Sequence, residues 1–329
     1  MSGHHTRGEI TLERFSPARA DDVARIFNAA TAAHPYCGVL TAETVLNRIC
    51  APSYFDPAAL LIAYRGGHPV AYAHGAFGKP RRVSDTPDRE IGNVRGLFFP
   101  PEDVGPGRAV LDELLRYLEG QGATYLHGWG SFAGYPFYRG LYLGTEPVAA
   151  ASHAHAIVRL VQAGFRVNQH SIFLARPLEE QPIGAAATPP VTLVEAPLTH
   201  ATTWDAESWI GLAPSQITAW RGPERVGQVT WDVLTDLIAK RGHPVGSIAS
   251  LSVEEGYRRQ GIARALSLEA MRRAHRAGAR EMTVATTQDN AAALHTYYGC
   301  GFAEREILLG YARPAPAPEQ WRSDERSGP

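Results

Sequence analysis

A stretch rich in proline, alanine and glycine divides the chain into two halves. Residues 179–190 read EEQPIGAAATPP and show no apolar periodicity, which is typical of a linker. Each half opens with a short strand-like segment, at residues 9–15 and 191–195. Each half also closes with a helix-like segment that runs into Gly-Phe, at residues 164–165 and 301–302. The chain therefore reads as a repeat of one fold.

We accordingly predict two domains, residues 1–178 and residues 191–313, with a disordered tail over residues 314–329. Apolar periodicity predicts helices at residues 21–33, 41–51, 109–118, 153–163, 261–277 and 290–298. Strands are expected at residues 60–64, 70–76, 94–99, 124–129, 216–220, 227–233, 247–253 and 282–286, with a final strand pair within 302–311. This order of elements predicts an α/β fold, in which each domain has a mixed, mostly antiparallel sheet flanked by helices.

The overall composition excludes several classes of protein. The 329 residues are 44% hydrophobic and 20% charged, with a formal net charge of −1, so no global field attracts nucleic acid or an anionic membrane. No apolar run is long enough to span a bilayer, and the amino terminus lacks the apolar core of a secretory signal. The widely spaced cysteines argue against a disulfide framework and against a zinc site: Cys37, Cys50 and Cys300. We expect a cytoplasmic protein without a metal, and its oligomeric state stays open.

The segment SLSVEEGYRRQGIARAL, residues 250–266, carries the first chemical signal. An apolar strand ends at Val253 and a helix begins near Gly261. Free amides at a helix start bind anions, and a glycine lets a bulky pyrophosphate approach the backbone. Arg258 and Arg259 add positive charge. The same letters would also fit a plain strand–turn–helix with surface arginines.

A second segment, Asn290-x-x-Ala293-x-x-x-Tyr297-x-x-x-Gly301-Phe302, follows the next predicted strand. Asn290 is suited to capping the helix, and Tyr297 lies about two turns later, on the same face as Ala293. Taken alone, Tyr297 also fits a core aromatic residue with a satisfied hydroxyl.

Together, in this order and separation, the two segments resemble the GCN5-related N-acetyltransferase (GNAT) family. The resemblance is specific over residues 247–302 and looser over the rest of the second half. It implies acetyl-CoA as the co-substrate and Tyr297 as the general acid that protonates the leaving thiolate. It further implies a cofactor site made of Leu251, Ser252, Val253, Arg258, Arg259, Gln260, Gly261, Ile262, Ala263, Arg264 and Asn290. One departure is Glu255, where members of the family often carry proline.

The implied reaction passes an acetyl group to a primary amine of a small molecule or peptide. No carboxylate lies in the strand at residues 247–253, so the general base stays open between a water chain and the carboxylates Asp232, Glu254 and Glu255. Two alternatives remain: a different donor, either another acyl-CoA or an aminoacyl-tRNA, and a non-catalytic CoA-binding sensor or scaffold. The near-neutral charge argues against tRNA, since tRNA binding requires many phosphate contacts.

The first half fits the same template as a degenerate copy. Val104-Gly-Pro-Gly107-Arg-Ala109 stands where the pyrophosphate turn is expected, and Pro106 removes one amide donor there. Leu160 replaces the tyrosine, and leucine cannot donate a proton. Whether this half binds CoA stays open.

An aromatic loop at residues 134–147 offers candidate acceptor-binding residues, Tyr138, Tyr142 and Glu146, together with Arg139. Asp232 is a further candidate. Alternatively, the rings of the loop pack on the neighbouring domain. Residues 201–212 leave room for about one helix, so we expect an acceptor site that is open on one side and that the first half helps to close. Full activity from residues 191–329 alone would contradict this expectation.

Overall fold

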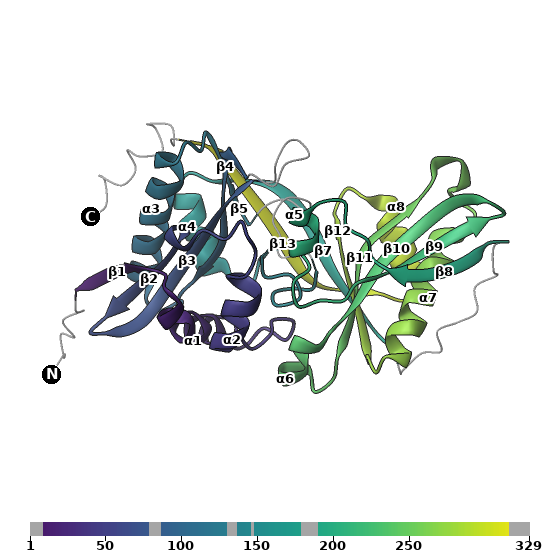
Figure 1. Ribbon diagram of the computed structural model, residues 1–329, viewed down its shortest axis with the longest axis horizontal. Coiled ribbons are helices and arrows are strands. Elements are labelled where there is room, and N and C mark those ends of the chain that lie inside the picture. Colours follow the sequence, from purple (N-terminus) through teal and green to yellow (C-terminus); the bar gives the residue numbers. More distant parts are fainter. Residues whose placement is uncertain (1–8, 79–86, 130–136, 146–147, 179–189, 316–329) are drawn as a thin grey trace.

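The computed structural model describes residues 9–78, 87–129, 137–145, 148–178 and 190–315. Most of the predicted linker, the tail from residue 316 and the candidate Glu146 lie outside these residues. The described chain folds into two halves that lie side by side and share one long sheet (Figure 1). None of the described helices has both the length and the apolar character needed to cross a membrane.

Each half supplies five consecutive strands to the sheet. The first half gives β1 (Ile10–Arg14), β2 (Leu60–Arg65), β3 (His68–Gly78), β4 (Asp88–Phe98) and β5 (Tyr125–Gly128). The second half gives β8 (Thr192–Pro197), β9 (Ser215–Arg221), β10 (Glu224–Leu234), β11 (Val245–Val253) and β12 (Glu281–Thr287). Neighbours are antiparallel, except that β4 pairs with β5 and β11 with β12 in parallel. The mixed, mostly antiparallel α/β fold predicted from the sequence is confirmed.

The helices cover both faces of the sheet. In the first half they are α1 (Ala20–Ala30), α2 (Ala42–Thr44), α3 (Val104–Gly120) and α4 (Ala154–Gln162). In the second half they are α5 (Thr203–Glu207), α6 (Ile238–Arg241), α7 (Ile262–Arg276) and α8 (Ala291–Gly299). The long helices α3 and α7 follow the parallel strands β4 and β11 and pack against their own sheets.

Side chains cap the starts of three described α-helices, α2, α5 and α8, and two predictions need correction. The Thr41 side chain accepts a hydrogen bond from the Thr44 amide, but α2 then continues as a π-helical turn over Val45–Ile49 rather than as one α-helix to residue 51. The segment expected to form a turn at Val104–Gly107 is instead the first turn of α3. Proline is tolerated in a first helical turn because the N–H groups there have no intrahelical partner.

The last strands of the two halves are exchanged. β7 (Arg166–Pro177) follows the first half but pairs with β12, while β13 (Ala303–Pro314) ends the second half and pairs with β5. The two strands also pair with each other, and the two-residue strand β6 (Ala149–Ala150) joins β13. The order along the sheet is therefore β1-β2-β3-β4-β5-β13-β7-β12-β11-β10-β9-β8, and β13 runs in yellow between the halves in Figure 1.

This exchange explains two sequence predictions that were wrong or incomplete. Residues 302–311 were expected to form a strand pair, but they form the single strand β13, whose partners come from the first half. Residues 166–177 were not predicted as a strand at all. Alternate residues of β7 serve different cores, with Phe173 and Ala175 in the core of the first half and Leu174 in the core of the second. The sheet is therefore buried on both faces at residues 173–176 of β7, as expected where two halves share a strand.

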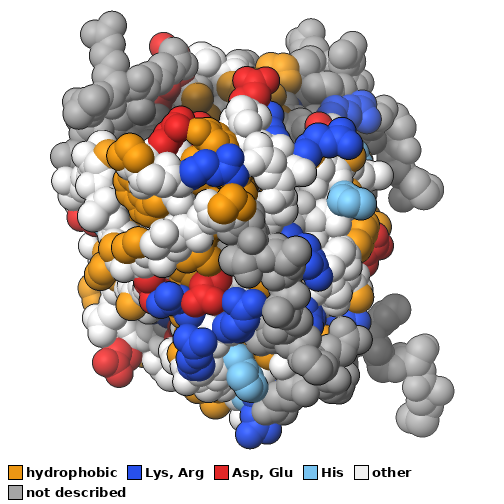
Figure 2. Space-filling model, turned by 90° about the vertical axis from the view of Figure 1, so that its right-hand side faces the viewer, with side chains coloured by type: hydrophobic (Ala, Val, Ile, Leu, Met, Phe, Trp, Pro, Cys, Tyr) orange, Lys and Arg blue, Asp and Glu red, His pale blue; other side chains and the backbone are white. Residues whose placement is uncertain are grey.

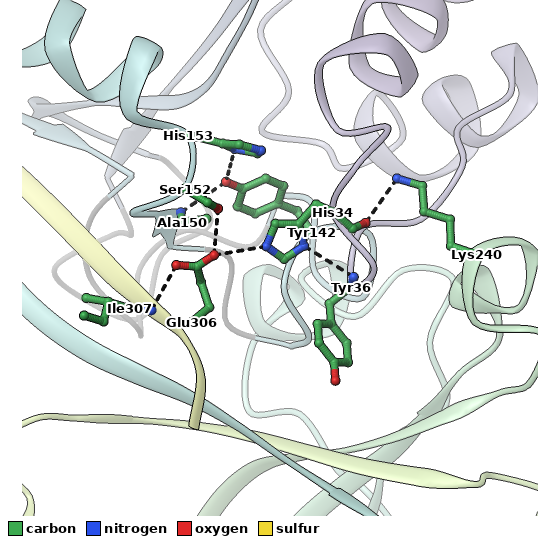
Figure 3. A network of polar contacts seen from close by, with 9 residues as sticks. All are labelled: His34, Tyr36, Tyr142, Ala150, Ser152, His153, Lys240, Glu306 and Ile307. Atoms are coloured by element: carbon green, nitrogen blue, oxygen red, sulfur yellow. Dashed lines mark hydrogen bonds and ion pairs between the residues drawn. The ribbon is translucent and has the colours of Figure 1, made fainter. Parts of the chain in front are cut away.

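A polar network joins the halves beside β13 (Figure 3). The Glu306 carboxylate accepts a hydrogen bond from Ser152 Oγ at 2.6 Å and lies 3.4 Å from His34 Nε2. Lys240 Nζ donates to the carbonyl oxygens of Thr31 at 2.6 Å and His34 at 3.3 Å. Since Lys240 belongs to the second half and its acceptors to the first, these bonds fix the halves against each other.

Candidate active site

The parallel strands of the second half separate at the end where the chemistry is expected. β11 pairs with β12 only from Val245 to Ile248. Ala249 forms a bulge against β10, where the register shifts between Thr230 and Trp231. Beyond the bulge, residues 251–253 pair with β10 on one edge, and in the described part of the chain their other edge has no strand partner. Leu251, Ser252 and Val253 thus offer backbone groups to a ligand, as the sequence predicts.

The turn after β11 presents unpaired amides. Arg259 and Gly261 have left-handed backbones, with φ of +62° and +81°. No side chain among the described residues caps α7, and its first helical bond runs from the Ala265 amide to the Gly261 carbonyl at 2.9 Å. The amides of Ile262, Ala263 and Arg264 precede that bond, so they point out of the helix start. This geometry is suited to an anion.

Side chains hold the turn in place around these amides. Arg258 Nε donates to the Val253 carbonyl at 3.2 Å, and Gln260 accepts from Arg221 at 2.8 Å. The Arg221 guanidinium lies 4.9 Å from the centre of the Tyr257 ring. Basic and acidic side chains lie beside one another on this end of the second half (Figure 2). Because basic and acidic side chains offset one another here, we expect the backbone amides of the turn to be its main anion-binding groups.

The later helix holds the two remaining candidates. Asn290 Oδ1 accepts a hydrogen bond from the Ala293 amide at 3.1 Å, so its predicted role as the cap of α8 is confirmed. Tyr297 is only 4% exposed and packs edge-on against Phe302, with ring centres 5.6 Å apart. Burial raises the pKa of Tyr297 well above 10, so the phenol stays protonated at neutral pH. Its hydroxyl makes no hydrogen bond to any described residue and is available to a ligand.

The corresponding region of the first half is filled by its own side chains. A Cβ at Gly107 would lie 2.4 Å from the Phe99 ring, so Phe99 occupies the space beside the start of α3. Asp103, at the same helix start, is paired with Arg65. Where β4 and β5 separate, the buried rings Phe98, Trp129 and Tyr142 contact one another with centres 5.9 to 6.4 Å apart. Leu160 is fully buried where the second half has its tyrosine.

A cavity of about 370 Å³ lies beside β11 in the second half. Its floor is formed by Gln216, Gln228, Thr230, Ala249 and Ser250 of β9, β10 and β11. Trp204 and Trp209 line it from the α5 segment, and Arg139 lines it from the first half. Because Ser250 directly precedes residues 251–253, the cavity adjoins the open edge of β11.

The first half also covers the short α5 segment. The rings of Tyr54 and Trp204 have centres 4.0 Å apart, and the Glu207 carboxylate accepts from the amide and hydroxyl of Ser53 at 2.8 and 2.7 Å. Both halves therefore build this wall, as expected from the short chain between β8 and β9.

The candidate acceptor residues that the structure describes do not line the cavity. Tyr138 and Tyr142 are buried in the core of the first half, where their hydroxyls bond His74 at 3.1 Å and His153 at 2.7 Å. The two rings therefore serve packing, but in the core of their own half and not on the neighbouring domain as the alternative expected. Asp232 accepts from the amides of Ala213 at 3.0 Å and of Val233 at 2.7 Å, and burial raises its pKa.

The two other carboxylates considered as bases lie on the surface. Glu254 is exposed and lies 3.3 Å from Arg225, and Glu255 is exposed as well. None of the three candidate carboxylates lines the cavity.

Comparisons with known proteins agree with this geometry. Residues 185–302 match the acetyltransferase (GNAT) family. A mycothiol acetyltransferase from Propionibacterium freudenreichii subsp. shermanii is 32% identical over 116 residues, which make up 35% of this chain and 35% of that protein. The matched segment thus spans about a third of the curated relative.

Two solved structures share the fold over nearly the whole chain. A GCN5-related N-acetyltransferase from Sphaerobacter thermophilus has a TM-score of 0.63 and 16% identity, covering 93% of this chain and 95% of that one. A tandem GNAT protein from the clavulanic acid biosynthesis pathway has a TM-score of 0.67 and 14% identity, covering 94% and 100%. The second half of this chain matches the acetyltransferase (GNAT) family, and the chain as a whole shares the fold of a tandem GNAT protein.

Proposed function

We propose that this chain is an acyltransferase that moves an acetyl group from acetyl-CoA to a primary amine of a small molecule or peptide, within its second half. One observation carries the proposal: the open edge of β11 lies next to the uncapped start of α7. An extended pantetheine arm can pair with residues 251–253, while the diphosphate reaches the amides of Ile262, Ala263 and Arg264. Asn290 and Tyr297 then lie toward the thiol end.

The transfer itself needs little further chemistry from the protein. The neutral amine attacks the thioester carbonyl carbon, a C–N bond forms, and the C–S bond breaks. A backbone amide of β11, such as that of Val253, polarises the carbonyl oxygen. Tyr297 donates its proton to the departing thiolate, and its raised pKa keeps that proton available at neutral pH.

We assign no side chain as the general base. The three carboxylates considered from the sequence lie away from the cavity wall, so a water chain removes the proton of the amine in this proposal. We also propose a cytoplasmic location, where acetyl-CoA is available.

Thiol release from acetyl-CoA tests the proposal when it is measured against a panel of primary amines with the full chain. Tyr297→Phe should lower kcat by about 10²- to 10⁴-fold, the usual contribution of a general acid, and should leave acetyl-CoA binding unchanged. The neighbouring Tyr298→Phe is the matched control, because Tyr298 is 44% exposed and its hydroxyl bonds Glu304. Equal turnover of both variants would remove Tyr297 from the mechanism.

The other two functions give different results in the same assay. Tight CoA binding without thiol release for any amine would favour a non-catalytic sensor. Release from a longer acyl-CoA but not from acetyl-CoA would change the donor while keeping the site.

A further inference from the structure

Arg139 is the residue of the first half that lines the cavity, and its backbone is held firmly. The preceding residue, Tyr138, has a left-handed backbone with φ of +65°, which costs energy for a residue with a side chain. The Tyr138 ring is stacked on Phe27 with centres 6.1 Å apart, and its hydroxyl bonds His74. The Arg139 carbonyl accepts from Arg48 at 3.0 Å. Strain that is held in place this way is typical of a residue positioned for a function.

The side chain of Arg139 is positioned, but it has no anionic partner among the residues that the structure describes. Its guanidinium lies 4.1 Å from the centre of the Trp209 ring, on the cavity wall. Its Nε is buried and makes no hydrogen bond, and no carboxylate of the described residues lies within ion-pair distance of it. A buried N–H of a charged group costs free energy when it lacks an acceptor. The neighbouring arginine is different, because Arg48 pairs with Asp236.

The rest of the cavity complements a small bifunctional molecule. Trp204 and Trp209 supply apolar surface, and His200 and Asp205 line the cavity from the same segment. Gln228, Thr230 and Ser250 add a polar wall that belongs to the strands beside the open edge of β11. A ligand that bridges the cavity thus meets a cation at one wall and the transfer centre at the other. A stacked guanidinium directs its N–H groups sideways, in the plane that a carboxylate can meet with two parallel hydrogen bonds.

We propose that the amine acceptor also carries a carboxylate and that Arg139 binds this carboxylate while the amine faces β11. The inference rests on the proposed function and deepens it, since it names the substrate class. The first half thereby supplies the acceptor specificity of a reaction that takes place in the second half.

The test compares amines in pairs that differ only in the carboxylate, such as 6-aminohexanoate with hexylamine and phenylalanine with phenethylamine. The wild-type chain should acetylate the carboxylated member with a kcat/KM about 10- to 100-fold higher, the order expected for a charge-assisted hydrogen bond. Arg139→Gln should remove this preference mainly through the KM of the carboxylated amine, leaving the KM of acetyl-CoA unchanged. Arg139→Lys, which keeps the charge without the planar fork, should retain part of the preference.

The control is Arg116→Gln, because Arg116 is exposed on α3 of the first half and does not line the cavity. The inference is overturned if the wild type uses both members of each pair equally, or if Arg139→Gln slows both members equally. If no amine in the panel causes thiol release from acetyl-CoA, the proposed function has failed. In that case, calorimetry measures binding of the same pairs to the CoA-loaded chain and tests the inference separately. The inference is overturned if the wild-type chain binds neither of the carboxylated amines.

Discussion

Gly261 offers the sharpest test of the diphosphate site. It begins α7 with φ of +81°, a backbone conformation that costs an alanine about 1–2 kcal/mol. A Cβ at this position would meet no atom within 4 Å, so no steric clash adds to that cost in the free protein. Gly261→Ala should therefore lower the free energy of unfolding by about 1–2 kcal/mol. The added Cβ also stands on the open side of the turn, where the diphosphate must approach the backbone, so CoA binding should weaken by a further amount of about 1–2 kcal/mol, or about 5- to 30-fold.

The same helix provides a matched control. Gly278 follows the last turn of α7 with φ of +90°, and a Cβ there would also meet nothing within 4 Å. Gly278→Ala should thus cost about the same stability by the same mechanism. Thermal unfolding measures the shared cost, and titration calorimetry with CoA measures the Kd of each variant. An unchanged Kd in Gly261→Ala, or an equal rise in both variants, would refute the assignment of the diphosphate to this turn.

Three further outcomes follow from the structure. Calorimetry should give one CoA per chain, because aromatic rings fill the corresponding region of the first half, and a stoichiometry of two would contradict this. Residues 191–329 expressed alone should aggregate or stay unfolded, because the fragment lacks β7 and exposes an edge of β12; a monomeric, folded fragment in circular dichroism and gel filtration would contradict the shared sheet. Burial lowers the pKa of His74 to about 3, so between pH 6.5 and 3 the unfolded chain binds a proton that the native state excludes. The free energy of unfolding should therefore fall by about 2 kcal/mol from this group between neutral pH and pH 5, and urea unfolding of His74→Gln should show a smaller pH difference than the wild type.

Sequence alone predicted the local structure of the proposed cofactor segments, because its signals are local. A strand that ends at Val253, an uncapped helix at Gly261 and a cap at Asn290 are all set by residues within a few positions of each other. The fold class followed from the same local periodicities. Backbone angles such as the left-handed Arg259 sharpen these predictions but do not change them.

The strand exchange and the acceptor wall were beyond local patterns. The partner of β7 is set by packing against residues about a hundred positions away. Residues 173–176 of β7 are buried on both faces, so they lack the apolar–polar alternation that marks a half-exposed strand. Arg139 reaches the cavity because the halves pack together, while Tyr138 and Tyr142, on the same loop, turn into the core instead. Sequence identifies the loop as unusual but cannot decide which of its side chains faces outward.

The crossing of β7 and β13 has a consequence for how this architecture can change over time. The last strand of each half pairs with a strand of the other half, so deleting one half leaves the other with an unpaired strand edge inside its sheet. A half that loses its own reaction chemistry is therefore still required for the folding of the half that keeps it. Because such a half carries no catalytic residues, substitutions can accumulate where it contacts the other half. The loop that carries Arg139 lies at this contact.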